Sequence, residues 1–403
     1  MRYRKPNLLL YRIAQFVCGI VARLVFRRKV LRNEIRGKKG PFVVIANHQA
    51  AYDFVNLIGL SKRPMSFVIS SSFFYSLPIN GFLQRIGVIP KQQFQTTAAD
   101  MKNMKAVIDA GQPLVIYPAG LMCEDGVSTP IPCATYKFLK WLNVDVYVAR
   151  VSGTYFVMPK WAKGMRPGRT NIDVYKLFSK EELKNTDMDT LRQRTKEALT
   201  FDAYREQENL RVRYHKGGNI RGLEKVLYQC PHCMQEFTVE AVGDNTLRCT
   251  HCGCTHVSDE YGFLHHTEGP GEEYRYVSDW NRRINAALEQ RLLQGENISL
   301  SAPAVIQMVD HKKHKFVEVG SGTVTLSKLE FTIEGKLCGE DFCLQIPIEG
   351  IPTFPFKPGK YFEIQHGKDS YRCVLEDGRL AGKFINLVKA AYHAGKKSAA
   401  TKV

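Results

Sequence analysis

The sequence of 403 residues lacks an uninterrupted apolar segment long enough to cross a membrane. Its most apolar stretch, residues 8–26, is interrupted by Arg12 and Arg23, whereas a membrane-spanning helix needs roughly 18 or more predominantly apolar residues. No small-residue cleavage pattern follows this stretch, as it would in a secretory signal peptide. We therefore expect a cytoplasmic protein in a reducing compartment, where its eleven cysteines are thiols and metal ligands rather than disulfides.

Acidic residues are almost absent from the first 40 residues, which hold twelve Lys and Arg side chains against Glu34 alone. This tenth of the chain contributes +11 to a formal net charge of +18. A cationic segment of this kind indicates an anionic partner, either a nucleic-acid backbone or an anionic lipid surface. Composition alone does not choose between these two partners.

Residues 1–29 are predicted to form a basic membrane-associating segment, with one amphipathic helix over the proline-free residues 8–29. One narrow stripe of this helix is polar and consists of Arg12, Gln15, Gly19, Arg23 and Arg27. The rest of its circumference is apolar, which favours a helix lying in the lipid interface at the inner face of the cell membrane. The alternative is a helix packed on the domain behind it, with its Arg side chains merely solvated.

Residues 30–205 alternate short β-branched runs with helix-compatible stretches, which predicts an α/β domain with a mostly parallel sheet and flanking helices. The expected strands are residues 41–46, 66–70, 87–89, 113–117, 145–151 and 171–175, and the expected helices are residues 97–110, 134–142 and 188–199. A charged, glycine-containing stretch over residues 206–227 is predicted to be a linker.

Residues 228–264 contain a CxxC pair repeated after fifteen intervening residues, formed by Cys230, Cys233, Cys249 and Cys252. Two such pairs supply four thiolates, the tetrahedral ligand set typical of structural Zn²⁺. The spacing therefore predicts a zinc ribbon, and four protein ligands leave the metal no open position for catalysis. The alternative is two redox pairs or unrelated thiols.

The last third of the chain is predicted to be a helical connector over residues 265–300 followed by a β-rich domain over residues 301–395. Its expected helices are residues 280–293 and 379–393, and its expected strands include residues 322–327, 329–334, 361–366 and 371–375. Several strands closed by one helix resemble a pleckstrin-homology or GRAM-like module. The Lys-rich tail, residues 396–403, is expected to be frayed.

Residues 42–53 carry the most informative pattern, an apolar strand that ends in Asn47 and His48 with Asp53 five positions after the histidine. Positions five apart on one helix point about 140° apart, but a turn from strand to helix can bring them together. Asp53 would then bind one imidazole nitrogen of His48 and leave the other to take a proton from a hydroxyl. The attacking nucleophile would be the hydroxyl of the substrate.

This motif and three later blocks resemble those of the PlsC-type glycerolipid acyltransferases, which include the 1-acylglycerol-3-phosphate acyltransferases. The first block of that family, N-H-x4-D, is matched by residues 47–53. The second, a Gly-x-Ile/Val stretch that ends in a basic residue, is similar to residues 81–91. The third, usually F-P-E-G-T-R, reads Tyr-Pro-Ala-Gly-Leu-Met at residues 117–122, here called the third block, and the fourth resembles residues 146–153.

The resemblance implies transfer of a fatty-acyl group from an activated donor to the hydroxyl of a lysophospholipid at a membrane surface. The donor would be acyl-CoA, acyl carrier protein or acyl phosphate, His48 would be the general base, and Asp53 would orient it. Backbone N–H groups near Gly120 or of the helix following His48 would meet the oxyanion. The implied substrate-binding residues are Asn47, Lys91, Pro118, Gly120 and Arg150.

The third block departs from the family where the family holds the acceptor, because Ala119 and Met122 replace its Glu and Arg. Glu124 and Asp125, just downstream, could replace the carboxylate through a shifted loop, and Lys91 or Arg150 could meet a phosphate. Otherwise the acceptor is another lysolipid or a glycolipid hydroxyl. The competing interpretation is a catalytically degenerate membrane adaptor that uses the zinc ribbon and the β-rich domain for binding.

Nucleic-acid binding is a third class of function that positive charge and a zinc ribbon can indicate. Over residues 228–264, however, Arg248 is the only Lys or Arg, against five acidic residues. A net charge of −4 makes this ribbon a poor reader of a phosphate backbone. We therefore expect membrane lipids and a lysophospholipid, with acyl carrier protein as a candidate donor, and no nucleic acid as partner.

Overall fold

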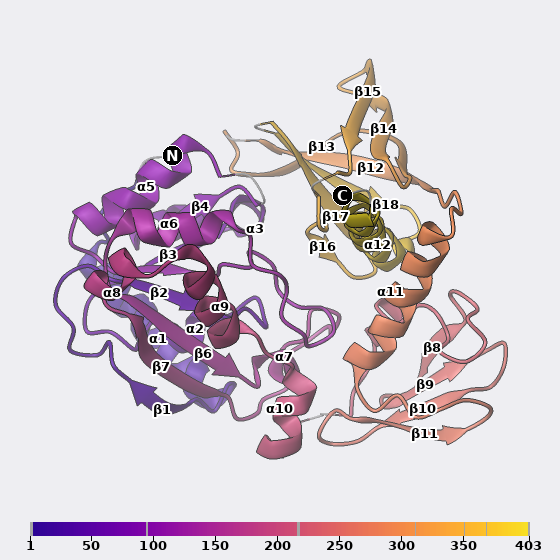
Figure 1. The fold of residues 1–403 in the computed structure, drawn as a ribbon, viewed down its shortest axis with the longest axis horizontal. Helices are drawn as coiled ribbons and strands as arrows, with labels where there is room; N and C mark the ends of the chain where they lie inside the picture. Colours follow the sequence, from indigo (N-terminus) through magenta and orange to yellow (C-terminus); the bar gives the residue numbers. More distant parts are fainter. Residues whose placement is uncertain are drawn as a thin grey trace. The chain divides into compact units, whose positions relative to one another are not determined.

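The structure is a computed structural model that describes residues 3–93, 96–215, 218–310, 312–349, 351–367 and 369–401. The chain forms two compact units (Figure 1). The first comprises Met1–Lys160 and Gly164–Lys216, and the second comprises Trp161–Lys163 and Gly217–Val403. Within the described ranges, no helix combines the length and the apolarity needed to cross a membrane.

The first unit is built on a seven-stranded sheet in the order β1-β7-β6-β2-β5-β3-β4. Its strands are β1 (Lys29–Asn33), β2 (Val43–Ala46), β3 (Ser66–Ser70), β4 (Ile89–Lys91), β5 (Leu114–Ile116), β6 (Val146–Ser152) and β7 (Asn171–Phe178). All neighbouring strands are parallel except β6 and β7, which run antiparallel. The predicted α/β domain is therefore present with a mixed, mostly parallel sheet.

Helices cover both faces of this sheet (Figure 1). They are α1 (Leu8–Leu24), α2 (Asp53–Leu57), α3 (Ser71–Ser76), α4 (Asn80–Arg85), α5 (Ala98–Asp109), α6 (Ala134–Leu142), α7 (Thr154–Val157), α8 (Lys180–Asn185), α9 (Met188–Leu199) and α10 (Ala203–Leu210). Successive side chains of a strand point to opposite faces. Val44 of β2 accordingly packs in a core with Tyr11 of α1, whereas Val43 packs in a second core with Leu139 of α6.

Two predicted boundaries of the first unit are wrong. The helix expected over residues 8–29 ends at Leu24, and Lys29–Asn33 forms β1, because this segment pairs with β7. The linker expected over residues 206–227 begins inside α10, where Gln207 is buried and holds the backbone of Val212 through both ends of its amide. Pairing with the distant strand β7 decided the first of these boundaries, and local composition does not report it.

The second unit begins with the 3₁₀ helix η1 (Leu223–Lys225) and a four-stranded antiparallel sheet in the order β11-β10-β9-β8. The strands are β8 (Val239–Val242), β9 (Thr246–Cys249), β10 (Thr255–Ser258) and β11 (Leu264–Glu268). This sheet extends four residues beyond the predicted end of the cysteine module at residue 264. Helix α11 (Val277–Leu293) follows it and covers the predicted helix.

A second seven-stranded sheet, in the order β15-β14-β13-β12-β18-β17-β16, completes the second unit. Its strands are β12 (Leu300–Asp310), β13 (Lys315–Leu326), β14 (Glu330–Leu337), β15 (Glu340–Pro347), β16 (Phe356–Lys357), β17 (Tyr361–His366) and β18 (Asp369–Leu375). All its neighbouring strands are antiparallel, and α12 (Leu380–Thr401) packs Phe384 and Val388 into its core. The predicted β-rich domain is present, and α12 extends into the tail that we expected to be frayed.

Candidate active site and metal centre

The structure brings His48 and Asp53 into hydrogen-bonding distance, as their spacing predicted. His48 lies in the turn that follows β2, and Asp53 is the first residue of α2, with 2.9 Å between His48 Nδ1 and Asp53 Oδ2. Because an ionised carboxylate only accepts hydrogen bonds, this contact places the ring proton on Nδ1 and leaves the lone pair on Nε2. The Asp53 side chain is 0% exposed, whereas that of His48 is 19% exposed. The His48 ring is therefore the accessible member of the pair.

Backbone groups of the same turn fix the carboxylate of Asp53. Oδ2 accepts the N–H groups of Gln49, at 2.7 Å, and Ala50, at 3.0 Å, in addition to His48 Nδ1. Three donors on one buried oxygen hold the carboxylate at one position, so the histidine is oriented against a rigid partner.

Asn47 and Gln49 connect this turn to β6 and α7. Asn47 is buried, and its amide both donates to the carbonyl of Val151 and accepts its N–H, each at 2.7 Å. Both polar ends of Asn47 are thus committed to the neighbouring strand, against its predicted substrate-binding role. Gln49 Oε1 accepts hydrogen bonds from Thr154 Oγ1, at 3.1 Å, and from the N–H of Tyr155, at 3.2 Å. Sequence reasoning did not single out Gln49, although its position inside the first block offered a signal.

Tyr117, the first residue of the third block, stacks on the imidazole of His48. The ring centroids are 4.4 Å apart and the ring planes are inclined by 29°. Burial, and to a lesser extent the negative charge of Asp53, raise the pKa of Tyr117 well above its usual value, so the phenol stays protonated. The stacking follows from the sheet, because β2 and β5 are parallel neighbours whose carboxyl ends meet at one edge.

The rest of the third block forms a turn beside the pair. Pro118 is buried, and the N–H of Gly120, whose φ is +69°, donates to the carbonyl of Tyr117 at 2.9 Å. The carbonyl of Gly120 in turn accepts Gln93 Nε2 at 2.7 Å. The N–H of Gly120 itself is therefore engaged in the turn and is not a free oxyanion donor.

The residues after the third block are packed against the catalytic turn. The thiol of Cys123 donates to the carbonyl of Gln49 at 3.6 Å, and the hydroxyl of Tyr155 donates to the carbonyl of Glu124 at 3.4 Å. Glu124 is itself buried. Its carboxylate is thus enclosed by the protein, which disfavours the hypothesis that it replaces the missing Glu of the third block.

The two cations expected to meet a phosphate lie in different surroundings. Lys91 ends β4, the edge strand, and its Nζ donates to the carbonyl of Gln92 at 2.9 Å. Burial lowers the pKa of Lys91, while the charge of Asp100 opposes this effect. Arg150 of β6 forms an ion pair with Glu206 at 2.7 Å. Because Glu206 already compensates its charge, the structure does not offer Arg150 as an unpaired phosphate ligand.

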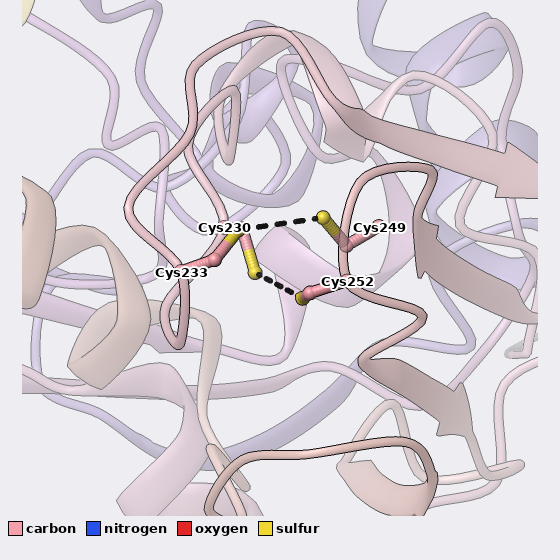
Figure 2. A group of neighbouring side chains, drawn as sticks. All are labelled: Cys230, Cys233, Cys249 and Cys252. Atoms are coloured by element: carbon pink, nitrogen blue, oxygen red, sulfur yellow. Dashed lines mark hydrogen bonds between the residues drawn. The ribbon is translucent and has the colours of Figure 1, made fainter.

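Four cysteine sulfurs of the second unit converge as the sequence predicted. The Sγ atoms of Cys230, Cys233, Cys249 and Cys252 all lie within 4.8 Å of one another, and none of the four forms a disulfide. Figure 2 shows the first pair facing the second. The Sγ atoms of Cys230 and Cys252 are 3.7 Å apart, and so are those of Cys233 and Cys249. Tetrahedral Zn²⁺ with bonds of about 2.3 Å to sulfur has sulfur–sulfur separations of about 3.8 Å. The four thiols therefore fit a tetrahedral, thiophilic metal ion.

Comparison with known protein families finds a similarity to part of the first unit. Residues 27–157 match the family model described as Acyltransferase, and this range contains the His48–Asp53 pair and the third block. Nothing among the curated proteins matches the chain.

Two solved structures are similar to parts of the chain. The 1-acyl-sn-glycerophosphate (LPA) acyltransferase PlsC from Thermotoga maritima has 16% sequence identity and a TM-score of 0.38, covering 51% of this chain and 96% of that one. The Ran binding domain of the nuclear complex component Nup2 from Ashbya gossypii has 14% identity and a TM-score of 0.20, covering 25% of this chain and 96% of that one.

Proposed function

We propose that the first unit transfers a fatty-acyl group from an activated donor to the hydroxyl of a lysophospholipid, with His48 as general base and Asp53 as its orienting partner. One observation carries this proposal. Within the residues that match the acyltransferase family, Asp53 Oδ2 binds Nδ1 of His48 and leaves Nε2 of a partly exposed ring to accept a proton.

The proposed reaction needs no acyl-enzyme intermediate. His48 Nε2 takes the proton of the acceptor hydroxyl as its oxygen attacks the acyl carbonyl carbon, and the negative charge of Asp53 stabilises the imidazolium that forms. The new ester C–O bond forms, the bond from the acyl carbon to the donor's sulfur or phosphate oxygen breaks, and the imidazolium returns its proton to that leaving group. The thiol of Cys123 is poorly suited to act as a nucleophile, because it is buried and donates to the carbonyl of Gln49, and burial raises its pKa well above the usual range.

A panel assay tests this function and narrows the acceptor. Purified protein is incubated with lysophosphatidate, other lysophospholipids and a glycolipid, each with acyl-CoA, acyl carrier protein or acyl phosphate as donor, and products are identified by mass spectrometry. We expect a diacyl product from at least one lysophospholipid. No product from any pair would contradict the proposal and favour the membrane adaptor.

The membrane surface at which this transfer would occur is proposed to contact α1. Tyr11, Ala14 and Ala22 of α1 are buried against the first unit. The opposite face is apolar and exposed, and its large side chains are Leu8, Leu9, Ile13, Phe16, Val17, Ile20 and Leu24. A helix that merely carried solvated Arg side chains has no need of such a face, so its composition supports a lipid contact at the inner face of the membrane.

Two cations of α1, Arg12 and Arg23, lie in different surroundings. Arg12 donates to Gln15 Oε1 at 2.6 Å and to the carbonyl of Lys62 at 2.9 Å, so it is tied to the domain. Arg23 is exposed beside the apolar face, at the end of the helix. We therefore expect the apolar side chains to supply most of the binding, with Arg23 adding an electrostatic contribution of about 1 kcal/mol.

Charged substitutions on the apolar face of α1 should abolish this contact. Leu9 and Phe16 are each 71% exposed, and burying a Leu or Phe side chain contributes about 1.5–3 kcal/mol. The double variant Leu9→Glu/Phe16→Glu should therefore bind phosphatidylglycerol-containing vesicles at least about tenfold more weakly in a sedimentation assay. Leu329→Glu, at a position that is 77% exposed in the second unit, is the matched control. Equal binding by the double variant and the control would contradict the membrane role of α1.

We further propose that the four cysteines hold one structural Zn²⁺, which when bound would cross-link the two CxxC pairs. The support is the donor set itself, four thiols within 4.8 Å that supply a complete tetrahedral shell. The protein's contribution is to present two sulfurs from the turn that precedes β8 and two from the end of β9 and the turn after it. A complete shell has no position for a substrate, so no step of the acyl transfer involves this site.

A further inference from the structure

The aromatic residue against His48 suggests a further role for the third block. Asp53 fixes His48 through a single ring nitrogen, and a ring held at one atom can still tilt about that hydrogen bond. Tyr117 contacts the face of the same ring, with centroids 4.4 Å apart and planes inclined by 29°. The two contacts are roughly perpendicular, one in the plane of the imidazole and one on its face, and together they define the ring orientation.

We propose that Tyr117 is a positioning residue that holds the imidazole of His48 with Nε2 directed at the acceptor. The proposal rests on the proposed role of His48 as general base. Offset or tilted aromatic pairs contribute about 0.5–1.5 kcal/mol beyond the burial of their area. A general base transfers a proton efficiently only when it is in hydrogen-bonding reach and correctly aimed, so loss of the stacked ring is expressed mainly in kcat.

The ring of Tyr117, rather than its hydroxyl, carries this role. Within the described residues, Tyr117 Oη is a buried atom with no hydrogen-bond partner. Removing a buried hydroxyl that has no partner leaves no other group unsatisfied and is close to neutral in free energy. Tyr117→Phe therefore keeps the stacked ring and should preserve the orientation of His48, whereas a change to an aliphatic side chain removes it.

The kinetic test compares ring-keeping and ring-losing variants in the acyl-transfer assay. Tyr117→Leu and Tyr117→Met should lower kcat about tenfold while changing the acceptor KM less than about twofold, and Tyr117→Phe should stay within about twofold of the wild type in both. Tyr136→Leu is the matched control, because Tyr136 is a buried tyrosine that packs in the core on the opposite face of the same sheet. It should lower Tm without changing kcat of the protein that remains folded.

A spectroscopic readout tests the same contact without turnover. A stacked phenol ring shifts the Cε1 proton of His48 upfield in the NMR spectrum, and the resonance is assigned by its loss in His48→Gln. We expect the shift to persist in Tyr117→Phe and Tyr136→Leu and to disappear in Tyr117→Leu and Tyr117→Met.

The outcomes separate this inference from the proposed function. If His48→Gln keeps full turnover, the proposed function is wrong. A second outcome is an inactive His48→Gln together with Tyr117→Leu and Tyr117→Met variants that keep wild-type kcat and an unchanged His48 resonance. In that case the positioning role of Tyr117 is wrong, while the proposed function stands. A kcat loss in Tyr117→Phe as large as in Tyr117→Leu would also overturn it, because the hydroxyl rather than the ring would then be the required group.

Discussion

Asp53→Asn is expected to lower kcat for acyl transfer about 10²- to 10⁴-fold while the acceptor KM changes little. The side chain is isosteric, and its carbonyl oxygen can keep the N–H groups of Gln49 and Ala50 that now bind Oδ2. What disappears is the negative charge beside Nδ1 of His48. Without it, the imidazolium that forms during proton transfer loses its stabilising partner.

The measurement for this variant is steady-state kinetics together with thermal unfolding. Asp189→Asn is the matched control, because Asp189 lies in α9 of the same unit with its side chain 89% exposed. The control should keep wild-type kcat. A kcat for Asp53→Asn within about threefold of the wild type, in a protein with unchanged Tm, would remove Asp53 from the mechanism.

Removal of one cysteine of the proposed metal site is expected to abolish metal binding and unfold residues 228–268. Structural Zn²⁺ sites contribute apparent binding free energies of about 10–16 kcal/mol, which is comparable to or greater than the stability of a typical domain. Cys230→Ser should therefore bind less than about one tenth of the metal bound by the wild type, measured by mass spectrometry of the native protein. Limited proteolysis should then cut residues 228–268 while the first unit stays protected.

The control for the metal site is Cys338→Ser. Cys338 is an exposed thiol of the same unit and lies outside the group of four. It should keep one metal ion per chain and the wild-type proteolysis pattern. Wild-type protein that carries no metal and yet resists proteolysis over residues 228–268 would contradict the proposed site.

Elements whose signals are local could be predicted from the sequence. The strand at Ser66–Ser70 and the helices Ala134–Leu142 and Met188–Leu199 have the bounds that the alternation of β-branched runs and helix-compatible stretches predicted. Strand β1 was missed, because its residues are mostly exposed and it exists as a strand only through pairing with β7. The absence of proline made the helix before it appear to continue, and only the distant partner shows where it ends.

The candidate site likewise contains one contact that could be predicted from the sequence and others that could not. The contact between His48 and Asp53 follows from a five-residue spacing across one turn, so the sequence contained it. The hydrogen bonds between Asn47 and Val151 join residues 104 positions apart in the sequence. The ion pair of Arg150 with Glu206 joins residues 56 positions apart. Which buried polar groups satisfy one another across such separations depends on the register of neighbouring strands and helices, which residue types alone do not specify. The predicted phosphate-binding role of Arg150 is the one most affected, because its pairing with Glu206 could not be foreseen from the sequence.

The measurement that tests the account most directly is acyl transfer by His48→Ala beside the wild type. Both proteins are purified, and thermal unfolding is used to verify that they have the same Tm. They are then incubated with the lysophospholipid and donor that give product with the wild type, and the product is quantified by mass spectrometry. Because a positioned general base contributes about 10²- to 10⁴-fold, we expect the variant to form product at least about 100-fold more slowly. Equal rates of product formation by the two proteins would contradict the assignment of His48 and with it the proposed mechanism.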